Sequence, residues 1–358
     1  MPGLRIVVAA LGSPGFVFPA IAVARALRDR GHRVTVATEP WAAAILGAQG
    51  LSCLPAPAGA FDTSRWFLPS VVAAQSGALR GAGADLFVVT SLTLGGLIAA
   101  ELAGVPCAVI GLLSEFPPPQ GANRQEIAAA WSAARAAVYL PPAPIERLAG
   151  DRLLRRGVPE LFVPPAPGPS ARFVGALGWE PPAPPVVRDW IAASSGPILY
   201  VHQARTFGAP GFWRALAPAL PPGVRVATST SRMDHPERLP AGALAGPVVP
   251  HGAVLDHAAA CICSGTSSVV LAALERGVPL VVVPAGGEQP DVADLVERAG
   301  VGVRSTPDTP SLAAALARAQ GSDPGPRAAL RRAFASLDGP SRAAQLVLEL
   351  VHSAAEAP

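Results

Sequence analysis

The first forty residues alternate between apolar runs and one amphipathic stretch. Leu4–Leu11 is an apolar run without polar alternation, which predicts a strand buried on both faces. The small residues of Gly12–Gly15 predict a tight turn, Pro19–Arg30 has helical apolar spacing, and His32–Thr38 is a second apolar run. A strand, a helix and a strand in this order predict a doubly wound α/β sheet.

The same order of elements returns after residue 250. Ala258–Cys263 reads as a buried strand, Ser264–Ser268 as a hydroxyl-rich turn, Val269–Arg276 as a helix and Leu280–Pro284 as a second strand. Such a turn can bind an anion, because the free amides of the first helical turn and the helix dipole favour negative charge. An ordinary capped helix is the alternative, since Ser and Thr are the usual caps.

Periodicity predicts further elements along both halves of the chain. We expect buried strands at Asp85–Ser91, Val105–Leu112, Ile198–Val201 and Gly223–Thr228, and helices at Gly95–Ala103, Ile127–Val138, Ser311–Ala319, Gly325–Leu337 and Ser341–Ser353. The Pro-rich piece Pro141–Pro169 is expected to be ordered loop and short helix.

Length and punctuation predict two domains. At 358 residues the chain exceeds the usual size of one core. The densest Pro and Gly punctuation lies in residues 173–187, which predicts a linker stiffened by polyproline segments. The expected division is a domain of residues 1–172, the linker, a domain of residues 188–340 and a final helical segment of residues 341–358.

Composition excludes several classes of function. Half the residues are hydrophobic and 15% are charged, so large cores are expected and disorder is not. A net charge of +3 without a basic cluster argues against nucleic-acid binding. All 28 positive residues are arginine, which excludes a Walker lysine or a pyridoxal-phosphate lysine. Neither a signal peptide nor an uncharged membrane span is evident, so we expect a cytoplasmic protein without stable membrane insertion.

The four cysteines are expected to be buried, reduced thiols. Cys53, Cys107, Cys261 and Cys263 fall in or beside apolar segments. Cys261 and Cys263 are spaced for a metal, but no second pair of ligands lies at a useful distance along the chain. The sequence also lacks an Asp-x-Asp motif, and we expect no metal and no cofactor.

The segment 250–302 carries, in order, Pro-His, His-Ala-Ala-Ala, a strand with a Gly-containing turn, Ala-Leu-x-x-Gly-Val-Pro and an acidic-Gln pair. These motifs and their order resemble the donor-binding segment of GT-B glycosyltransferases, in the branch that glycosylates natural products, sterols and lipids. The resemblance implies a fold of two doubly wound domains facing across a cleft. It also implies that the turn holds the diphosphate of a UDP- or dTDP-sugar and that the acidic-Gln pair bonds the sugar. These roles fall on Ser264, Gly265, Thr266, Ser267, Ser268 and Val269, and on Glu288 and Gln289.

Other donor contacts are expected at strand ends of the second half. The resemblance implies a nucleobase near Val249 and His251 and a ligand near Ser229, with Gly12 contributing from the first half. Where the family has a small turn after the strand, this chain has His202-Gln203-Ala204-Arg205. We expect Arg205, with His202, to stabilise the departing diphosphate, because a guanidinium can bind phosphate bidentately. A surface arginine is the alternative for Arg205. His251 and His257 could be catalytic, and packing is the alternative for these two histidines.

The opening segment contains Gly-Ser-Pro-Gly-Phe-Val-Phe-Pro at residues 12–19. Its Gly-Ser-x-Gly-x-Val-x-Pro pattern resembles the first turn of sterol glucosyltransferases and bacterial rhamnosyltransferases, with one departure. The family places an Asp or His, taken to be the general base or its partner, at the position of Phe16. A phenyl ring cannot accept a proton, and a base commonly contributes about 10²–10⁴ in rate. Either the acceptor is intrinsically nucleophilic, or another residue near the turn serves, or the protein binds without turnover. Candidate residues for the second option are Ser13, Asp62, Glu115 and Asp85.

The resemblance also implies where an acceptor binds. The irregular segments 56–74 and 114–123 help to line the acceptor site in the family, which points to Phe16, Trp66, Phe67 and Phe116. Packing of these aromatic residues into the domain is the alternative. The sequence thus predicts an inverting, metal-independent transfer of a sugar to a small hydrophobic acceptor. A catalytically silent nucleotide-sugar-binding protein, or a GT-B epimerase, are the alternatives, and a homodimer remains open.

Overall fold

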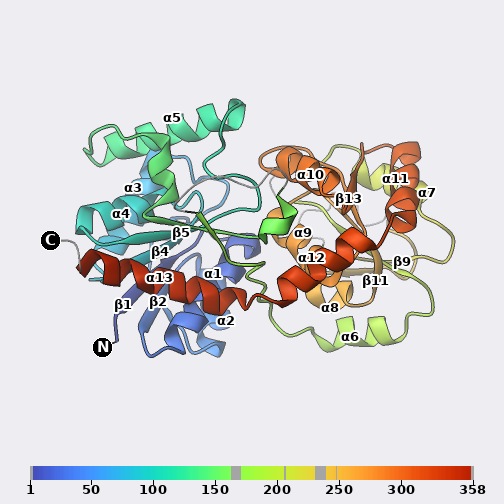
Figure 1. The fold of residues 1–358 in the computed structure, drawn as a ribbon, viewed down its shortest axis with the longest axis horizontal. Helices are drawn as coiled ribbons and strands as arrows, with labels where there is room; N and C mark the ends of the chain where they lie inside the picture. Colours follow the sequence, from blue (N-terminus) through green and yellow to red (C-terminus); the bar gives the residue numbers. More distant parts are fainter. Residues whose placement is uncertain (1–2, 163–170, 205–206, 230–238, 247, 356–358) are drawn as a thin grey trace. The chain divides into compact units, whose positions relative to one another are not determined.

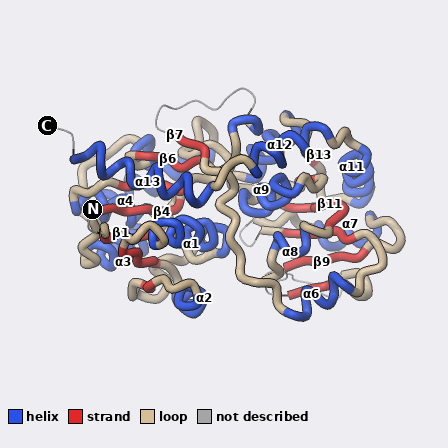
Figure 2. The backbone as a smooth tube through the Cα atoms, turned by 60° about the horizontal axis from the view of Figure 1, so that its bottom comes forward, coloured by secondary structure: helices blue, strands red, loops and turns tan. Residues whose placement is uncertain are grey.

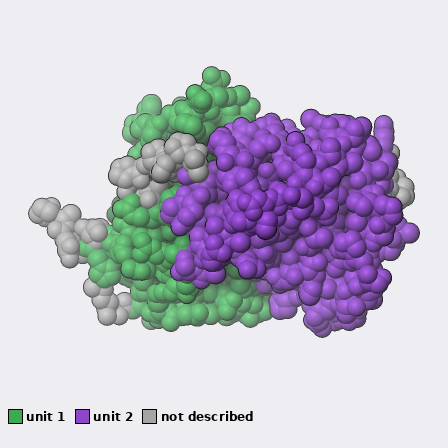
Figure 3. Space-filling model, turned by 45° about the vertical axis from the view of Figure 1, so that its right-hand side comes forward, with its two compact units in different colours: residues 1–157, 167–179, 337–358 green, residues 158–166, 180–336 purple. Residues whose placement is uncertain are grey.

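The computed structural model describes residues 3–162, 171–204, 207–229, 239–246 and 248–355 (Figure 1). The chain forms two compact units, coloured separately in Figure 3. Unit 1 comprises residues 1–157, 167–179 and 337–358, and unit 2 comprises residues 158–166 and 180–336. Unit 1 therefore contains both ends of the chain, and its last segment returns after unit 2 is complete.

Unit 1 is built on a parallel sheet. Its seven described strands lie in the order β3-β2-β1-β4-β5-β6-β7, and every ladder between them is parallel. The strands are β1 (Arg5–Ala9), β2 (Arg33–Ala37), β3 (Ser52–Cys53), β4 (Leu86–Thr90), β5 (Cys107–Ile110), β6 (Arg152–Arg155) and β7 (Ala171–Phe173). Parallel strands need crossover connections, and the helices between them provide these crossovers.

Helices cover both faces of the unit 1 sheet (Figures 1 and 2). In β1, Ile6 and Val8 pack with α1 and the last helix α13, whereas Val7 and Ala9 pack with α3, α4 and α5. Because successive side chains of a strand point to opposite faces, each face acquires its own core. The helices are α1 (Pro14–Arg28), α2 (Ala43–Ala48), α3 (Pro69–Arg80), α4 (Leu94–Ala103), α5 (Ala122–Ala137) and α13 (Gly339–Ala355).

Several predictions for unit 1 were wrong in their boundaries or missed an element; α5, for example, begins at Ala122 rather than at Ile127. Helix α1 begins at Pro14 rather than at Pro19, because Pro14 occupies the first helical turn, where its missing N–H is not needed. Pro19 lies buried inside the helix. Strand β6 lies within the piece predicted to be loop and short helix, and β7 ends at Phe173, where the linker was expected to begin.

Unit 2 repeats the architecture with a six-stranded parallel sheet among its described residues. The order is β10-β9-β8-β11-β12-β13. The strands are β8 (Ile198–His202), β9 (Arg225–Ser229), β10 (Leu244–Gly246), β11 (Ala258–Cys263), β12 (Leu280–Val282) and β13 (Gly302–Arg304). Strand β11 has the boundaries that the apolar run predicts.

Helices again cover the unit 2 sheet on both faces. One core joins Leu199 and Val201 of β8 to α7 and α11, while α8 and α9 contact the sheet from the other side, beside Tyr200 and Cys261. The helices are α6 (Pro185–Ala192), α7 (Phe212–Ala219), α8 (His251–Leu255), α9 (Ser267–Arg276), α10 (Gln289–Arg298), α11 (Thr309–Gly321) and α12 (Gly325–Ala335).

Each sheet has a point at which the strand order reverses direction. In unit 1 this point lies between β1 and β4, and in unit 2 it lies between β8 and β11. In open α/β sheets, ligands bind outside the carboxyl ends of the two strands that flank such a point. The turns after β1, β4, β8 and β11 are therefore the first places to look for a site.

Other features limit what a site can contain. The four cysteines are unpaired, with Cys53 partly buried and the other three buried. Among the residues that the structure describes, no group of three His, Cys, Asp or Glu side chains is arranged to hold a metal ion. None of the described helices combines the length and apolar character needed to cross a membrane.

Candidate functional site

The turn after β11 in unit 2 is bonded to the turn after β8. The Ser264 backbone N–H donates to the His202 carbonyl at 3.0 Å, and the Ala204 backbone N–H donates to the Ser264 hydroxyl at 3.1 Å. The Ser264 side chain is fully buried, so it joins the two strand ends rather than facing outward. Arg205, the predicted phosphate contact, lies outside the described residues.

Gly265 gives this turn a backbone conformation that residues with a side chain rarely adopt. Its φ is +93°, in the left-handed region, and a Cβ there would lie 2.8 Å from Val282 Cγ1 and 3.1 Å from the Gln289 carbonyl oxygen. Thr266 then caps α9 with extended backbone and without a side-chain cap bond. The turn thus brings the chain close against β12 and the first residue of α10.

A carboxylate already occupies the start of α9. Glu288 Oε1 accepts the Ser267 backbone N–H at 3.0 Å, and Glu288 Oε2 accepts the Ser267 hydroxyl at 2.6 Å. The positive end of the helix dipole and the first-turn amides, which lack partners within the helix, explain this attraction. The predicted anion site is therefore able to hold an anion, and in this state the anion is the chain's own Glu288. The neighbouring Val269 side chain is buried in the core.

Gln289 has a structural role that the sequence did not indicate. Its Oε1 accepts the backbone N–H groups of Ala285 and Gly286 at 2.7 and 3.2 Å, and its Nε2 donates to the Phe207 carbonyl at 3.0 Å. The Gln289 side chain is only 2% exposed. Its amide shapes the loop after β12, and the carbonyl and amide groups expected to bond a sugar are engaged within the chain.

Phe207 is a site residue that sequence reasoning missed. Its ring lies over Gly286 and Gly287, since a Cβ on either glycine would come within 2.9 Å of the ring. The Phe207 side chain is 47% exposed, so one part of the ring packs on the loop and another faces outward. The available signal was an aromatic residue two positions after Arg205, the last residue of the segment that replaces the family's small turn after β8.

The segment at Val249 is pinned by two side chains from neighbouring strands. The Val249 N–H donates to Ser229 Oγ at 3.0 Å, and the Tyr200 hydroxyl donates to the Val249 carbonyl at 3.5 Å. The Val249 side chain is buried, whereas that of Val248 is 49% exposed. The backbone groups expected to meet a nucleobase are therefore partly used by Ser229 and Tyr200, and Val248 offers the outward-facing surface.

Two histidines meet beside this segment. His251 Nδ1 is hydrogen-bonded to the Tyr200 hydroxyl, and the rings of His202 and His251 are 5.0 Å apart, edge to face. Burial lowers the pKa of His202 to about 3 and that of His251 to about 4. Burial also raises the pKa of Tyr200 well above its usual value. All three groups are neutral at pH 7, which suits packing at the edge of a site better than phosphate binding.

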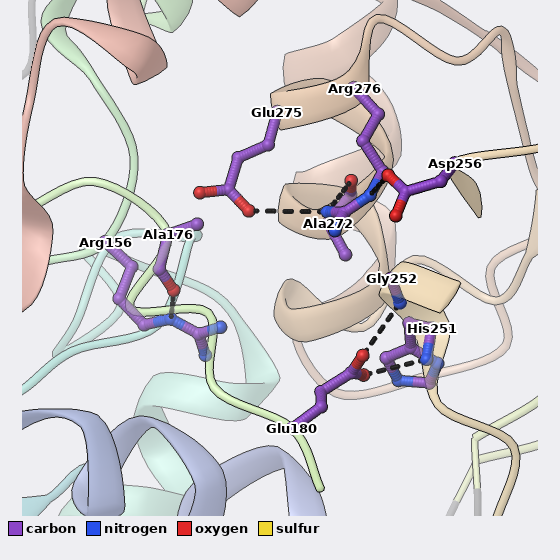
Figure 4. Close-up of polar contacts among 9 residues, drawn as sticks. All are labelled: Arg156, Ala176, Glu180, His251, Gly252, Asp256, Ala272, Glu275 and Arg276. Atoms are coloured by element: carbon purple, nitrogen blue, oxygen red, sulfur yellow. Dashed lines mark hydrogen bonds and ion pairs between the residues drawn. The ribbon is translucent and has the colours of Figure 1, made fainter. Parts of the chain in front are cut away.

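Glu180 anchors the beginning of α8. Its carboxylate accepts the backbone N–H groups of His251 at 2.8 Å and Gly252 at 2.7 Å (Figure 4). Burial raises the pKa of Glu180, and these two hydrogen bonds and the charge of Arg276 oppose that rise. Arg276 is itself held by Asp256 at 2.7 Å. The two hydrogen bonds of Glu180, which the sequence does not indicate, fix the backbone that carries His251.

In unit 1, three segments meet at the carboxyl end of β1. The Gly12 N–H donates to the Phe61 carbonyl at 2.6 Å, and the Glu39 carboxylate accepts the Phe61 N–H through Oε1 at 2.8 Å. A Cβ on Gly12 would overlap the Glu39 side chain, so the glycine allows Glu39 to pack against the turn. We call Gly12, Glu39 and Phe61 the junction.

Two residues at the junction were not named as candidates from the sequence: Glu39, which is part of it, and Trp41, which is bonded to it. Glu39 follows β2 at its carboxyl end, and Trp41 lies two residues later in the short 3₁₀ helix η1 (Pro40–Ala42). The Trp41 indole N–H donates to the Gly12 carbonyl at 2.9 Å, while 43% of the side chain is exposed. A carboxylate directly after a predicted strand was the signal available for Glu39.

Ser13 and Phe16 lie next to the junction. Ser13 caps α1 with extended backbone, and its side chain makes no capping bond. Phe16 is partly buried against the core formed by α1 and α13. At the other strand of the reversal point, Leu92 follows β4 with φ at +69°, an unusual value for a residue that is not glycine.

The carboxylates proposed from the sequence are engaged or distant. Asp62 Oδ1 accepts both the backbone N–H and the hydroxyl of Ser64, at 2.8 and 2.7 Å. Asp85 precedes β4 at the opposite, amino edge of the sheet, where it pairs with Arg5 at 2.6 Å. Glu115 is exposed, and its negative charge opposes the fall that burial causes in the pKa of Arg155.

The predicted acceptor aromatics differ in exposure. The rings of Trp66 and Phe67 meet edge to face at 5.9 Å; Trp66 packs partly into the core and Phe67 is 47% exposed. Phe116 is buried, which supports the packing alternative for that residue. Phe67 and Trp41 are therefore the aromatic side chains of this region that present exposed surface.

Comparison with proteins of known sequence finds glycosyltransferases. A PGL/p-HBAD biosynthesis glycosyltransferase of Mycobacterium tuberculosis is 30% identical over 154 residues, which are 43% of this chain and 36% of that protein. An uncharacterised glycosyltransferase of Mycobacterium leprae is 27% identical, with 84% of each chain covered. A 4'-demethylrebeccamycin synthase of Lentzea aerocolonigenes is 35% identical over 38% of this chain and 33% of its own. The chain thus spans about a third of the first of these relatives. No protein-family model matches the chain.

Solved structures match over almost the whole chain. The calicheamicin glycosyltransferase CalG4 is 24% identical with a TM-score of 0.72, covering 99% of this chain and 100% of its own. The glycosyltransferase VinC, solved in complex with dTDP, is 17% identical with a TM-score of 0.71, covering 98% and 100%. The predicted fold class is confirmed. The chain has the fold of the GT-B glycosyltransferases, and it is similar in sequence to bacterial glycosyltransferases.

Proposed function

We propose that this chain transfers a sugar from a nucleotide diphosphate to a small hydrophobic acceptor. The donor binds to unit 2 at the reversal point between β8 and β11, and the acceptor binds to unit 1 at the reversal point between β1 and β4. The donor is a dTDP- or UDP-sugar, and dTDP is the first choice because a structural neighbour was solved with it. The transfer inverts the anomeric centre and uses no metal.

One observation carries the donor side of this proposal. The start of α9, with its Gly265 turn, already binds a carboxylate through Ser267 at the carboxyl edge of a Rossmann-like sheet. A diphosphate needs the same combination of helix dipole and amide donors. Charge that develops on the leaving diphosphate is stabilised by such preorganised dipoles. Glu288 moves from Ser267 to the sugar hydroxyls when the nucleotide binds.

The acceptor side is supported by exposed aromatic surface. Trp41 and Phe67 are both more than 40% exposed in unit 1, at segments that begin or lie beside the carboxyl edge of the sheet. Exposed aromatic rings that are held at one end by packing or a hydrogen bond are suited to apolar ligands. Phe67 retains its proposed acceptor role, and Trp41 joins it.

The test measures nucleotide release from a panel of dTDP- and UDP-sugars with aromatic alcohols as acceptors. We expect release that depends on the acceptor, an inverted product by NMR and full activity in EDTA. Nucleotide binding measured by calorimetry without release under any acceptor would support the silent alternative, which Phe16 in the base position favours. No binding of dTDP or UDP at all would contradict both.

Arg205 supplies the cation of the leaving group in this proposal. It follows Ala204, whose N–H is bonded to the turn after β11. The change Arg205→Ala is expected to weaken dTDP binding and to lower turnover, since a bidentate charge-assisted contact is lost. Arg214→Ala, on the exposed surface of α7, is the matched control. Equal donor affinity and turnover in the two variants would rule out the role.

A further inference from the structure

The junction of unit 1 holds a carboxylate in a defined position. Glu39 leaves the carboxyl end of β2, packs against Gly12 and binds the Phe61 N–H through Oε1. These contacts fix the side chain from two other segments of the chain. In the part of the chain that the structure describes, Glu39 Oε2 makes no hydrogen bond, so one oxygen anchors the group and the other remains an acceptor.

The junction also adjoins the position where a base is missing. Gly12 is followed by Ser13 and by Phe16 on the first turns of α1, and Phe16 cannot accept a proton. The same turn is bonded to Trp41, whose exposed ring comes from the segment that carries Glu39. A proton acceptor and an apolar surface therefore lie on one short segment at the edge where ligands of such sheets bind.

We propose that Glu39 is the general base of the transfer, an inference that rests on the proposed function. As the acceptor oxygen forms its bond to the anomeric carbon, the acceptor O–H bond breaks and its proton passes to Glu39 Oε2. The bond from the anomeric carbon to the diphosphate oxygen breaks, and its electron pair leaves with the diphosphate. The protonated Glu39 then returns its proton to water. Trp41 packs against the apolar body of the acceptor.

The rival carboxylates of unit 1 are less suited to this step. Asp62 commits Oδ1 to two bonds with Ser64, and Asp85 lies at the opposite edge in an ion pair with Arg5. Glu115 is exposed, and its negative charge interacts with the positive charge of Arg155. A proton taken up by Glu115 would remove this attraction. Glu39 combines an anchored oxygen with a free one, and it touches the turn itself.

The decisive variant is Glu39→Gln, because an amide oxygen still accepts the Phe61 N–H but cannot take a proton. Transfer from the best dTDP- or UDP-sugar is measured with 4-methoxyphenol and 4-nitrophenol, which are similar in size and differ in acidity. We expect kcat/KM to fall by about 10²–10⁴ with the less acidic 4-methoxyphenol and by less than tenfold with 4-nitrophenol. The affinity for dTDP should stay unchanged, which separates the step from donor binding.

Three further variants make the result specific. Asp29→Asn, an exposed carboxylate at the far end of α1, is the matched control. Asp62→Asn and Glu115→Gln are measured with the same two phenols. An equal loss with both phenols in Glu39→Gln would show a structural role, and an unchanged enzyme would show none; either overturns the proposal. Selective loss in Asp62→Asn or Glu115→Gln, with Glu39→Gln unaffected, would place the base there.

Gly12→Ala tests the same geometry without removing the carboxylate. The new Cβ would overlap the Glu39 side chain and displace it from the turn. We expect transfer to 4-methoxyphenol to fall more than transfer to 4-nitrophenol, and a variant that transfers to 4-methoxyphenol as well as the wild-type protein would count against the proposal. If the wild-type protein transfers no sugar, the proposed function fails first; if it transfers and Glu39→Gln matches it, only the base assignment fails.

Discussion

The two reversal points have the same strand order but different chemistry. At the unit 2 edge, polar side chains bind backbone groups of neighbouring segments: Ser264 binds Ala204, Glu288 binds Ser267, and Gln289 binds three backbone groups. At the unit 1 edge, the Glu39 carboxylate is hydrogen-bonded through one of its two oxygens, and the exposed ring of Trp41 lies two residues further along the chain. The unit 2 edge thus presents a hydroxyl, an amide and the Glu288 carboxylate that are bonded within the chain, whereas the unit 1 edge presents aromatic surface next to the Glu39 carboxylate.

The difference between the side chains of the two edges agrees with the ligand that each edge is proposed to bind. A diphosphate requires several fixed hydrogen-bond donors, and fixing them uses the side chains of the turn itself. A small apolar acceptor requires aromatic area and one group that interacts with its hydroxyl. The same scaffold therefore serves two chemistries through the turns that follow its strands.

Gly265→Ala should produce the largest effect, because it breaks the turn of the unit 2 edge. The backbone lies at φ +93°, and the added Cβ would meet Val282 and the Gln289 carbonyl. Strain and overpacking together should lower the free energy of unfolding by about 2–5 kcal/mol. Binding of dTDP should be lost, which calorimetry and urea unfolding measure. Gly77→Ala, on α3 with open space around it, is the control, and equal behaviour of the two variants would contradict the account.

The histidine pair of unit 2 should make stability depend on pH. Burial lowers the pKa of His202 to about 3 and that of His251 to about 4, whereas the unfolded chain titrates near 6.5. Between pH 6.5 and 4 the unfolded state takes up protons that the folded state refuses, so the free energy of unfolding falls as the pH falls. Above pH 6.5 this contribution is fully present.

We expect a loss of about 1–3 kcal/mol between pH 7 and pH 5, measured from urea midpoints. The double variant His202→Gln/His251→Gln should flatten this dependence. His352→Gln, which changes an exposed histidine of unit 1, should keep the slope of the wild-type protein. A slope unchanged by the double variant would show that other groups dominate the acid sensitivity.

Sequence reasoning succeeded where one pattern decided the structure. Strand β11 and the turn before α9 follow from a long apolar run and a hydroxyl-rich segment, which local spacing describes well. Strand β6 was missed because Arg152 and Arg155 lie at its two ends. The two buried leucines between them are too short an apolar run to indicate a strand. Helix α1 was predicted to start too late because Pro19 looked like a first residue, although the helix already begins at Pro14.

Residue types for the candidate site could be proposed from the sequence, but their hydrogen-bond partners could not. The turn and the acidic-Gln pair were found by resemblance, yet Ser267 and Glu288 are 21 residues apart, and no periodicity indicates their bond. Glu39 and Phe61 are 22 residues apart, and their contact depends on how an irregular loop folds onto the sheet. Long-range hydrogen bonds of loops are set by the tertiary structure, which spacing along the chain does not encode.

Glu288→Ala sharpens the comparison by removing the anion that occupies the unit 2 edge. The Ser267 amide and hydroxyl are then free for phosphate, so dTDP should bind roughly three- to tenfold more tightly. Sugar transfer should nevertheless fall, because the carboxylate proposed to bind the sugar is gone. Glu297→Ala, an exposed residue of α10, is the control. Unchanged or weaker dTDP binding in calorimetry would mean that Glu288 does not compete with the nucleotide.

Val248→Trp should give the smallest effect, and it asks whether aromatic surface can be added to the unit 2 edge. The Val248 side chain is 49% exposed beside the pinned backbone of Val249. Stacking of a base on an aromatic ring is worth about 1–3 kcal/mol in well-formed sites, and an exposed ring should supply only part of this. We expect dTDP to bind two- to fivefold more tightly by calorimetry. Val186→Trp, on the exposed surface of α6, should leave the affinity unchanged. Equal affinities in the two variants would place the nucleobase away from Val248, and the Tyr200–Ser229 contacts would then stabilise unit 2 without shaping a base site.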